Sequence, residues 1–152
     1  KKNLPKDFKT RERIVSQGIT GVNESSRLKM MIVKDAYCAN SLNYLTLKRD
    51  VNLKYLLGVF NSKLLNFIFS KFSTNSNVNG YEVDNLPIII NDSFVNPIAT
   101  TVEKILSITK DEDYIQNKAK QVKVREYEAE IDKIIYNLYG LTDAEKSIVE
   151  GR

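Results

Sequence analysis

The sequence contains no histidine, which removes much of the usual chemistry of enzymes. Histidine is the commonest general base, and it also completes the Ser–His and Cys–His pairs of nucleophilic enzymes and most zinc sites. The single cysteine, Cys38, has no partner for a disulfide within the chain, so we expect a small buried residue in a strand and a reducing compartment. These absences exclude the commonest nucleophilic and zinc-dependent mechanisms.

Long apolar runs are also missing. No run approaches the roughly 20 residues that a membrane helix needs. The basic N-terminal stretch KKNLPKDFKTRER has no apolar segment of the kind found in signal peptides. We therefore expect a cytoplasmic protein with no membrane partner. Because the first residue is Lys1 and not Met, we also expect a fragment or a processed chain, with residues 1–12 as a linker from a missing upstream domain.

Glycines and carboxylates give no sign of a catalytic site. Gly18 and Gly21 lack the Lys-Ser/Thr of a phosphate loop, so they predict a turn. Carboxylates gather in a charged connection and along one helix, where solvated charge is a better interpretation than metal binding: Asp111, Glu112, Asp113, Glu126, Glu128 and Glu130. We expect no catalytic residue and no metal site in this chain.

Charge is divided unevenly between the two halves of the sequence. Residues 1–80 carry 14 Lys/Arg and 5 Asp/Glu, a net charge of +9, whereas residues 81–152 carry 9 and 14, a net charge of −5. The two values give the overall net charge of +4. Such asymmetry directs the first half toward a polyanion and leaves the second half for protein contacts. A solvated basic surface without a partner is the alternative.

The hydrophobic pattern of the first half predicts a small sheet and a helical layer. Short apolar stretches around residues 14–15, 28–33 and 41–47 predict three strands in a largely antiparallel sheet. Apolar residues then recur at helical spacing over 53–72, with Asn52 as a cap. Gly58 and the Asn61-Ser62 pair interrupt this pattern, so we expect two helices or one bent helix covering one face of the sheet.

The second half predicts a short extended segment followed by helices. Residues 88–90 favour a strand, and a helix follows with Pro97 near its first position. The clearest helix runs over about 119–139 and stops at Gly140, and Thr142 begins a last short helix. The two longer helices should form an antiparallel hairpin, which serves either as core support or as an interface. The predicted fold class is α+β, with residues 13–95 as the recognition domain and 96–152 as a C-terminal helical region.

Several segments together carry a family resemblance. The stretch LLGVFNSKLLNFIF, followed after a polar loop by YEVDNLPI, resembles the C-terminal specificity domain of Type IIG restriction–modification enzymes and related adenine-N6 DNA methyltransferases, the TaqI-like specificity domain. The upstream IVSQGITG and YCANSLNYLTL are similar to the paired strand segments of that family, and the tail EAEIDKIIYNLYGLTDAEKSIVEG to its closing helices. The catalytic motifs of the parent enzymes, a glycine-rich cofactor loop and an Asn/Asp-Pro-Pro-Tyr/Phe motif, are absent. The resemblance therefore implies a module that reads double-stranded DNA for an upstream methyltransferase domain of the same chain.

DNA binding needs cations for phosphates and amides or arginines for base edges. Nine cations of the basic half are candidate phosphate ligands: Arg11, Arg13, Arg27, Lys29, Lys34, Lys48, Arg49, Lys63 and Lys71. Candidate base readers are its amides: Gln17, Asn40, Asn43, Asn75, Asn77 and Asn79. The polar loop at residues 73–80 is the expected reading element, because a buried helix fixes its start, and Tyr81 and the segment at Pro87 fix its far end. A flexible turn rich in turn-forming residues is the alternative for this loop.

The resemblance implies no cofactor and no small-molecule ligand for this chain. S-adenosylmethionine, with Mg²⁺ as a further candidate, is expected in the catalytic domains of the parent, which would be an adenine-N6 methyltransferase or a Type IIG enzyme. Two other functions stay open. One is a fragment of the specificity subunit of a Type I system, and the other is a protein-interaction adaptor that works through the helical hairpin.

Overall fold

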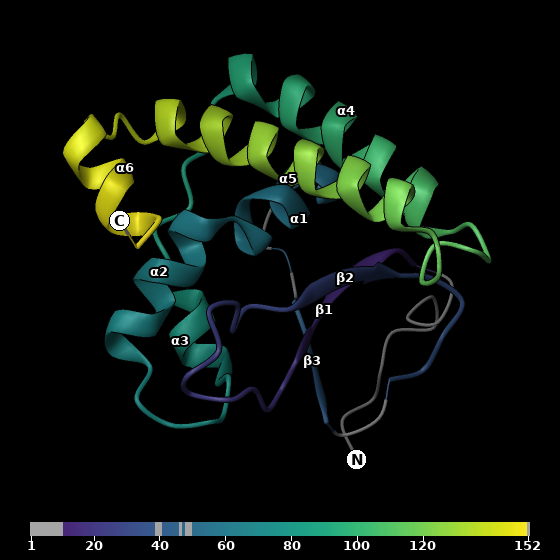
Figure 1. Ribbon diagram of the computed structural model, residues 1–152. Helices are drawn as coiled ribbons and strands as arrows, with labels where there is room; N and C mark the ends of the chain where they lie inside the picture. Colours follow the sequence, from purple (N-terminus) through teal and green to yellow (C-terminus); the bar gives the residue numbers. More distant parts are fainter. Residues whose placement is uncertain (1–10, 39–40, 46, 48–49, 152) are drawn as a thin grey trace.

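The computed structural model describes residues 11–38, 41–45, 47 and 50–151 (Figure 1). These residues form the predicted α+β fold, a three-stranded antiparallel sheet packed on helices. The elements in order are β1 (Arg13–Gln17), β2 (Met30–Val33), β3 (Leu42–Tyr44), α1 (Leu53–Asn61), α2 (Lys63–Phe72), α3 (Gly80–Asp84), α4 (Asp92–Thr109), α5 (Lys118–Leu138) and α6 (Asp143–Val149).

Strand β1 is the centre of the sheet. It pairs antiparallel with β2, with Arg13 opposite Val33, and with β3, with Val15 opposite Tyr44. Ile14 and Val15 are buried. All three strands form near their predicted positions, although β3 is shorter than the predicted stretch. Cys38 is an exception to the prediction, because it lies beyond the end of β2 and is only half-buried.

The predicted turn at residues 18–21 is wrong. The chain continues past β1 and pairs with the loop after α2: the amide of Thr20 donates to the Ser76 carbonyl at 2.8 Å, and the Gly18 carbonyl accepts from the amide of Val78 at 2.9 Å. Ile19 and Asn77 form an isolated antiparallel bridge. The chain turns only afterwards, at residues 22–23. Buried backbone groups need partners, and here a loop distant in sequence supplies them.

Helices α1 and α2 are two separate helices, as the polar interruption predicts. The Asn52 side chain accepts from the amides of residues 54 and 55 and caps α1. Ser62 ends α1 in an extended conformation, with ψ 155°, and its hydroxyl caps α2 by accepting from the amide of Leu65. Figure 1 shows α1 between the sheet and the helical hairpin, so it is the central element of the core.

Helices α4 and α5 form the predicted antiparallel hairpin, and α4 packs on α1 (Figure 1). The predicted start of α4 is wrong, because Asn91 caps the helix and Pro97 lies within it. A proline in the second turn removes only one intrahelical hydrogen bond, and the helix continues. Gly140 ends the α5 region with φ 68°, and Thr142 and Glu145 form the predicted capping box of α6. The predicted domain boundary at residues 95–96 lies inside α4, and the hydrophobic core takes residues from both sides of it.

The predicted strand at residues 88–90 does not form. Residues 87–90 have no regular secondary structure, and their carbonyls bind tyrosine hydroxyls instead of a neighbouring strand. Tyr55 donates to the Ile89 carbonyl at 2.5 Å, and Tyr139 donates to the Pro87 carbonyl at 2.6 Å. In the part of the chain that the structure describes, no helix is long and apolar enough to cross a membrane.

Candidate nucleic-acid interface

The loop between α2 and α3, residues 73–79, lies on the far side of α1 from the helical hairpin (Figure 1). We call it the 73–79 loop. It is anchored at both ends, because Ser73 and Val78 are buried, whereas residues 74–77 are exposed. The predicted anchor at Tyr81 is wrong: Tyr81 is 65% exposed. Glu82 holds this end instead, since its carboxylate accepts from the amide of Asn79 at 2.9 Å.

Three segments far apart in the sequence meet at this loop. The stretch after β1 pairs with residues 76–78, and the Asn43 side chain on β3 donates to the Val78 carbonyl at 2.7 Å. The amide of Gln17 donates to the Lys29 carbonyl at 3.1 Å, which brings the start of β2 to the same edge. The side chains of Gln17, Asn75 and Asn77 are exposed there. The fold thus gathers several predicted base readers at one end of the sheet.

The predicted base readers differ in whether their side-chain amides already form hydrogen bonds within the protein. Asn43 is half-buried and bound to the loop. Asn79 donates to the Glu82 carboxylate at 3.0 Å, which helps to start α3. The Asn75 oxygen accepts from the amide of Asn77 at 2.9 Å, an Asx turn, and leaves the Asn75 nitrogen exposed. Asn40 lies outside the described residues.

The predicted phosphate ligands occupy three places. Lys29 and Lys71 are exposed near the loop, Lys29 beside Gln17 and Lys71 at the end of α2. Arg11 and Lys34 are exposed at the opposite end of β1. Lys63 lies at the start of α2, some 15 Å of helix away from the loop. Lys48 and Arg49 lie outside the described residues.

Two predicted phosphate ligands have their guanidinium groups inside the protein. Arg13 is 7% exposed and donates to the carbonyls of Arg11 and Ala36. Arg27 is 1% exposed and donates to carbonyls of the 73–79 loop. The sequence pattern showed their charge but not their burial, because no periodicity marks an arginine that enters a core.

One acidic residue lies among these cations. Glu24 pairs with the ammonium group of Lys29, and its other oxygen accepts from the amide of Gly21 at 3.0 Å. The hydrogen bonds from Lys29 and from the Gly21 backbone hold the pKa of Glu24 below its usual value. Lys29 therefore reaches a phosphate only by sharing its charge with Glu24 or by releasing it.

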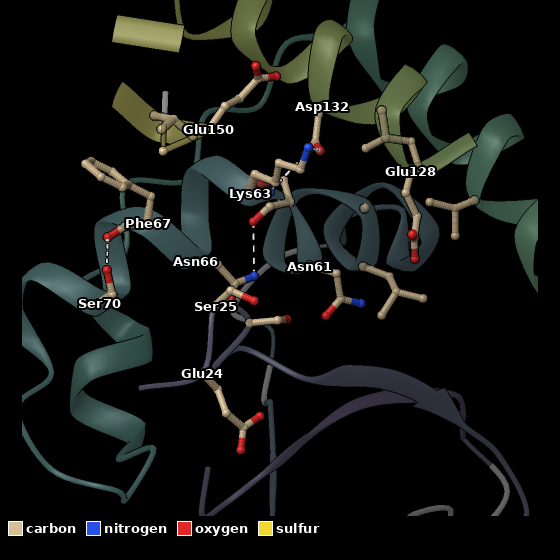
Figure 2. Close-up of a pocket in the computed structure, with 18 of the residues that line it drawn as sticks. Glu24, Ser25, Asn61, Lys63, Asn66, Phe67, Ser70, Glu128, Asp132 and Glu150 are labelled. Carbon is tan, nitrogen blue, oxygen red and sulfur yellow. Dashed lines mark hydrogen bonds and ion pairs between the residues drawn. The ribbon is translucent and has the colours of Figure 1, made fainter. Parts of the chain in front are cut away.

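A groove of ≈ 800 Å³ is lined by residues of α1, α2, α4, α5 and α6 and by residues 24–26 (Figure 2). Leu57, Val102 and Ile131 form its apolar floor, and Lys63 and Asp132 face each other across it. The Asp132 carboxylate accepts from the amide of Lys63 at 2.9 Å and so binds the free first turn of α2. Burial raises the pKa of Asp132, against the opposing effect of Lys63.

Two carboxylates in this groove have raised pKa values. Burial and the charge of Asp132 raise the pKa of Glu128, the next carboxylate along the groove. Among the described residues, however, no group of three or more His, Cys, Asp and Glu side chains is placed to hold a metal ion. The Asp132–Lys63 contact joins α5 to α2, and we assign it a structural role.

Two apolar side chains beside the loop are exposed, which the sequence does not predict for Ile19 or for Tyr81. Ile19 is 58% exposed next to Asn77, and Tyr81 is 65% exposed in the first turn of α3. Exposed apolar and aromatic groups beside polar amides are common at binding surfaces. The available signal was an aromatic residue directly after a polar loop.

An α+β scaffold that presents a hydrogen-bonded polar loop among surface cations is typical of a nucleic-acid recognition module. The model of the TaqI-like C-terminal specificity domain family matches residues 1–88. The chain belongs to this family, and it is a DNA-recognition module of the restriction–modification type. No curated protein matches the chain.

Proposed function

We propose that the end of the sheet with the 73–79 loop reads the bases of duplex DNA, and that the module directs an upstream adenine-N6 methyltransferase to its target. The observation that carries this proposal is that three exposed amides from two distant segments, Gln17 on β1 and Asn75 and Asn77 on the loop, are joined by backbone hydrogen bonds between these segments. Amides that form two hydrogen bonds with an adenine edge can discriminate sequence in the major groove. Exposed amides on a fixed backbone are suited to that task.

The proposed phosphate ligands are the five predicted ones that the structure leaves exposed: Arg11, Lys29, Lys34, Lys63 and Lys71. Arg13 and Arg27 are left out of this set, because their guanidinium groups bind backbone carbonyls inside the protein. If each of the five neutralises one phosphate, the logarithm of the binding constant should fall against the logarithm of salt concentration with a slope of about −4.5.

The parent protein in this proposal is a Type IIG enzyme or an adenine-N6 methyltransferase that supplies S-adenosylmethionine chemistry and, where it cuts DNA, a nuclease. The support is the family model that matches residues 1–88. A specificity subunit of a Type I system is the second candidate, because it would use the same DNA-reading surface. Sequencing the complete gene separates the two, since a methyltransferase motif in the same reading frame is expected only for the first.

The first experiment measures the affinity of the whole chain for random duplex DNA between 50 and 200 mM salt, which are the concentrations at which phosphate contacts dominate. Lys71→Ala should weaken binding to all duplexes and make the slope shallower by about one unit. Lys118→Ala is the matched control, because Lys118 is exposed at the start of α5 in the acidic half. A salt-independent affinity would favour an adaptor that binds protein through the hairpin.

The second experiment tests base reading in the complete parent enzyme. Asn77→Ala should relax one position of the modified sequence by about 1–3 kcal/mol, the usual value of one good base contact. Replacing residues 74–77 with glycine and serine should relax it further. A modified site that is unchanged after this replacement would mean that the loop is only a turn.

A further inference from the structure

Arg27 differs from the other cations of the basic half in its environment. It is 1% exposed, and its guanidinium carbon lies 5.1 Å from the centroid of the Phe69 ring. No carboxylate among the described residues forms an ion pair with it within 4.0 Å, so hydrogen bonds must compensate the buried charge. Burying an unpaired charge costs free energy, so the groups that bind Arg27 show which part of the structure it stabilises.

The terminal nitrogens of the Arg27 guanidinium donate to backbone carbonyls of the 73–79 loop, and its Nε donates to the Thr20 hydroxyl at 3.4 Å. Nη1 donates to the Ser73 carbonyl at 2.8 Å, and Nη2 donates to the Asn75 carbonyl at 2.5 Å and to the Asn77 carbonyl at 3.5 Å. One planar group thus binds three alternate residues of the loop. Because these carbonyls turn inward to Arg27, the side chains of Asn75 and Asn77 remain on the surface.

The backbone of Arg27 is itself fixed by helix α2. The side-chain oxygen of Asn66, which is 3% exposed, accepts from the amides of Arg27 and Leu28 at 2.7 Å each. The Asn66 nitrogen donates to the Ser62 carbonyl at 3.0 Å, at the break between α1 and α2. A continuous hydrogen-bonded path therefore runs from the central helices through Arg27 to the exposed loop.

We propose that Arg27 is a positioning residue that fixes the conformation of the 73–79 loop from inside and thereby sets which DNA sequence the module prefers, without touching DNA. This inference rests on the proposed function, because it assumes that the loop reads bases. A phosphate ligand would act through its charge alone. A positioning residue acts through the geometry of the guanidinium, which a lysine ammonium cannot reproduce at three carbonyls.

Arg27→Lys separates these two roles, because it keeps the positive charge and removes the planar guanidinium with its several donors. The whole chain and the variant are each used to select sequences from a random-sequence duplex library, and their salt slopes are measured in parallel. Wild type should enrich a defined sequence. Arg27→Lys should retain the salt slope but lose about fivefold or more of the preference at one or more positions.

Hydrogen exchange measures the loop directly. The amide of Thr20 donates to the Ser76 carbonyl in the loop, and the amide of Val78 in the loop donates to the Gly18 carbonyl. Both amides should therefore exchange about tenfold faster in Arg27→Lys. Ile135→Val is the matched control, because it removes one methylene group from a fully buried site in α5 and leaves the loop contacts intact. It should lower the unfolding midpoint without changing the sequence preference.

If Arg27→Lys does not unfold cooperatively, Phe69→Leu replaces it, because that variant keeps the charge but removes the ring that holds the guanidinium in position, and the same loss of preference is expected. A wild-type preference that survives in the folded variant would overturn the inference and leave the proposed function intact. An equal loss of preference in Ile135→Val would also overturn it, because general destabilisation would then be the cause. A wild-type chain that enriches no sequence would overturn the proposed function and the inference together.

Discussion

Replacing Gly58 with alanine should destabilise the protein, although alanine is the better helix former. Gly58 lies in α1 where this helix crosses α4, and a Cβ atom there would lie 2.6 Å from Cγ2 of Ile98 and 3.0 Å from Cγ2 of Val102. Helix propensity favours alanine by about 1 kcal/mol. Overpacking in a well-filled core costs about 1–3 kcal/mol.

The overpacking term should be the larger one. Ile98 and Val102 are buried at 0% and 3% exposure, and β-branched side chains in a helix have one strongly preferred rotamer. The helices must therefore move apart, because neither side chain can turn away. With an overpacking cost in the upper part of that range, about 2–3 kcal/mol, we expect a net loss of about 1–2 kcal/mol in the free energy of unfolding.

The measurement is urea-induced unfolding of the whole chain followed by circular dichroism. Gly80→Ala is the matched control, because Gly80 begins α3 and no heavy atom lies within 4 Å of the position of its added Cβ. That variant should gain up to about 1 kcal/mol by reducing the entropy of the unfolded chain. A Gly58→Ala variant as stable as wild type would refute the close packing of α1 on α4.

Three further predictions concern the helical hairpin and its contacts. Ile131→Asp should cost several kcal/mol in the free energy of unfolding, because it places a carboxylate at a 5% exposed site. Lys118→Ala, at an exposed site, should change that free energy by less than about 0.5 kcal/mol. Equal losses in chemical unfolding would mean that α5 faces the other way. The raised pKa of Asp132 means that the folded state binds its proton more tightly, so this residue lowers stability as pH rises from the usual aspartate pKa of 3.8 to its value in the folded state. The free energy of unfolding, measured as a function of pH, should fall less over this range in Asp132→Asn than in wild type. The same pH dependence in both proteins would contradict the prediction. Tyr139→Phe should cost about 1 kcal/mol by removing the hydroxyl that binds the Pro87 carbonyl, and an unaltered melting temperature would show that water replaces it.

Local signals in the sequence predict much of the fold. Asn52 and Ser62 bind the first amides of α1 and α2, and Gly140 ends α5 at positive φ, because capping depends on residues within one helical turn. The three strands follow from short apolar runs for the same reason. The predicted loop after α2 also forms, with Gly80 as the first residue of α3 rather than the last residue of the loop.

The contacts that complete the site are long-range, and the sequence does not specify them. Arg27 binds carbonyls 46 to 50 residues further along the chain, and Tyr139 binds a carbonyl 52 residues before it. A backbone carbonyl has no identity in the sequence, so a side chain that seeks one leaves no pattern. The apolar residues 88–90 predict a strand for the same reason, since nothing local shows that tyrosine hydroxyls replace the partner strand.

The burial of Arg27 changes what the charge of the basic half means. The number of cations predicts a surface in which each Lys or Arg adds affinity for phosphate. Arg13 and Arg27, however, donate hydrogen bonds to backbone carbonyls inside the protein. In our proposal, affinity comes from the exposed lysines and Arg11, and sequence preference comes from the loop that Arg27 holds. Because the base-reading side chains are not the phosphate ligands, a substitution at Asn77 can change the preferred sequence while the phosphate contacts and the buried guanidinium of Arg27 stay the same. Such a separation lets one scaffold serve different DNA targets, and it predicts that exchanging the side chains of the loop will alter the target more than the affinity.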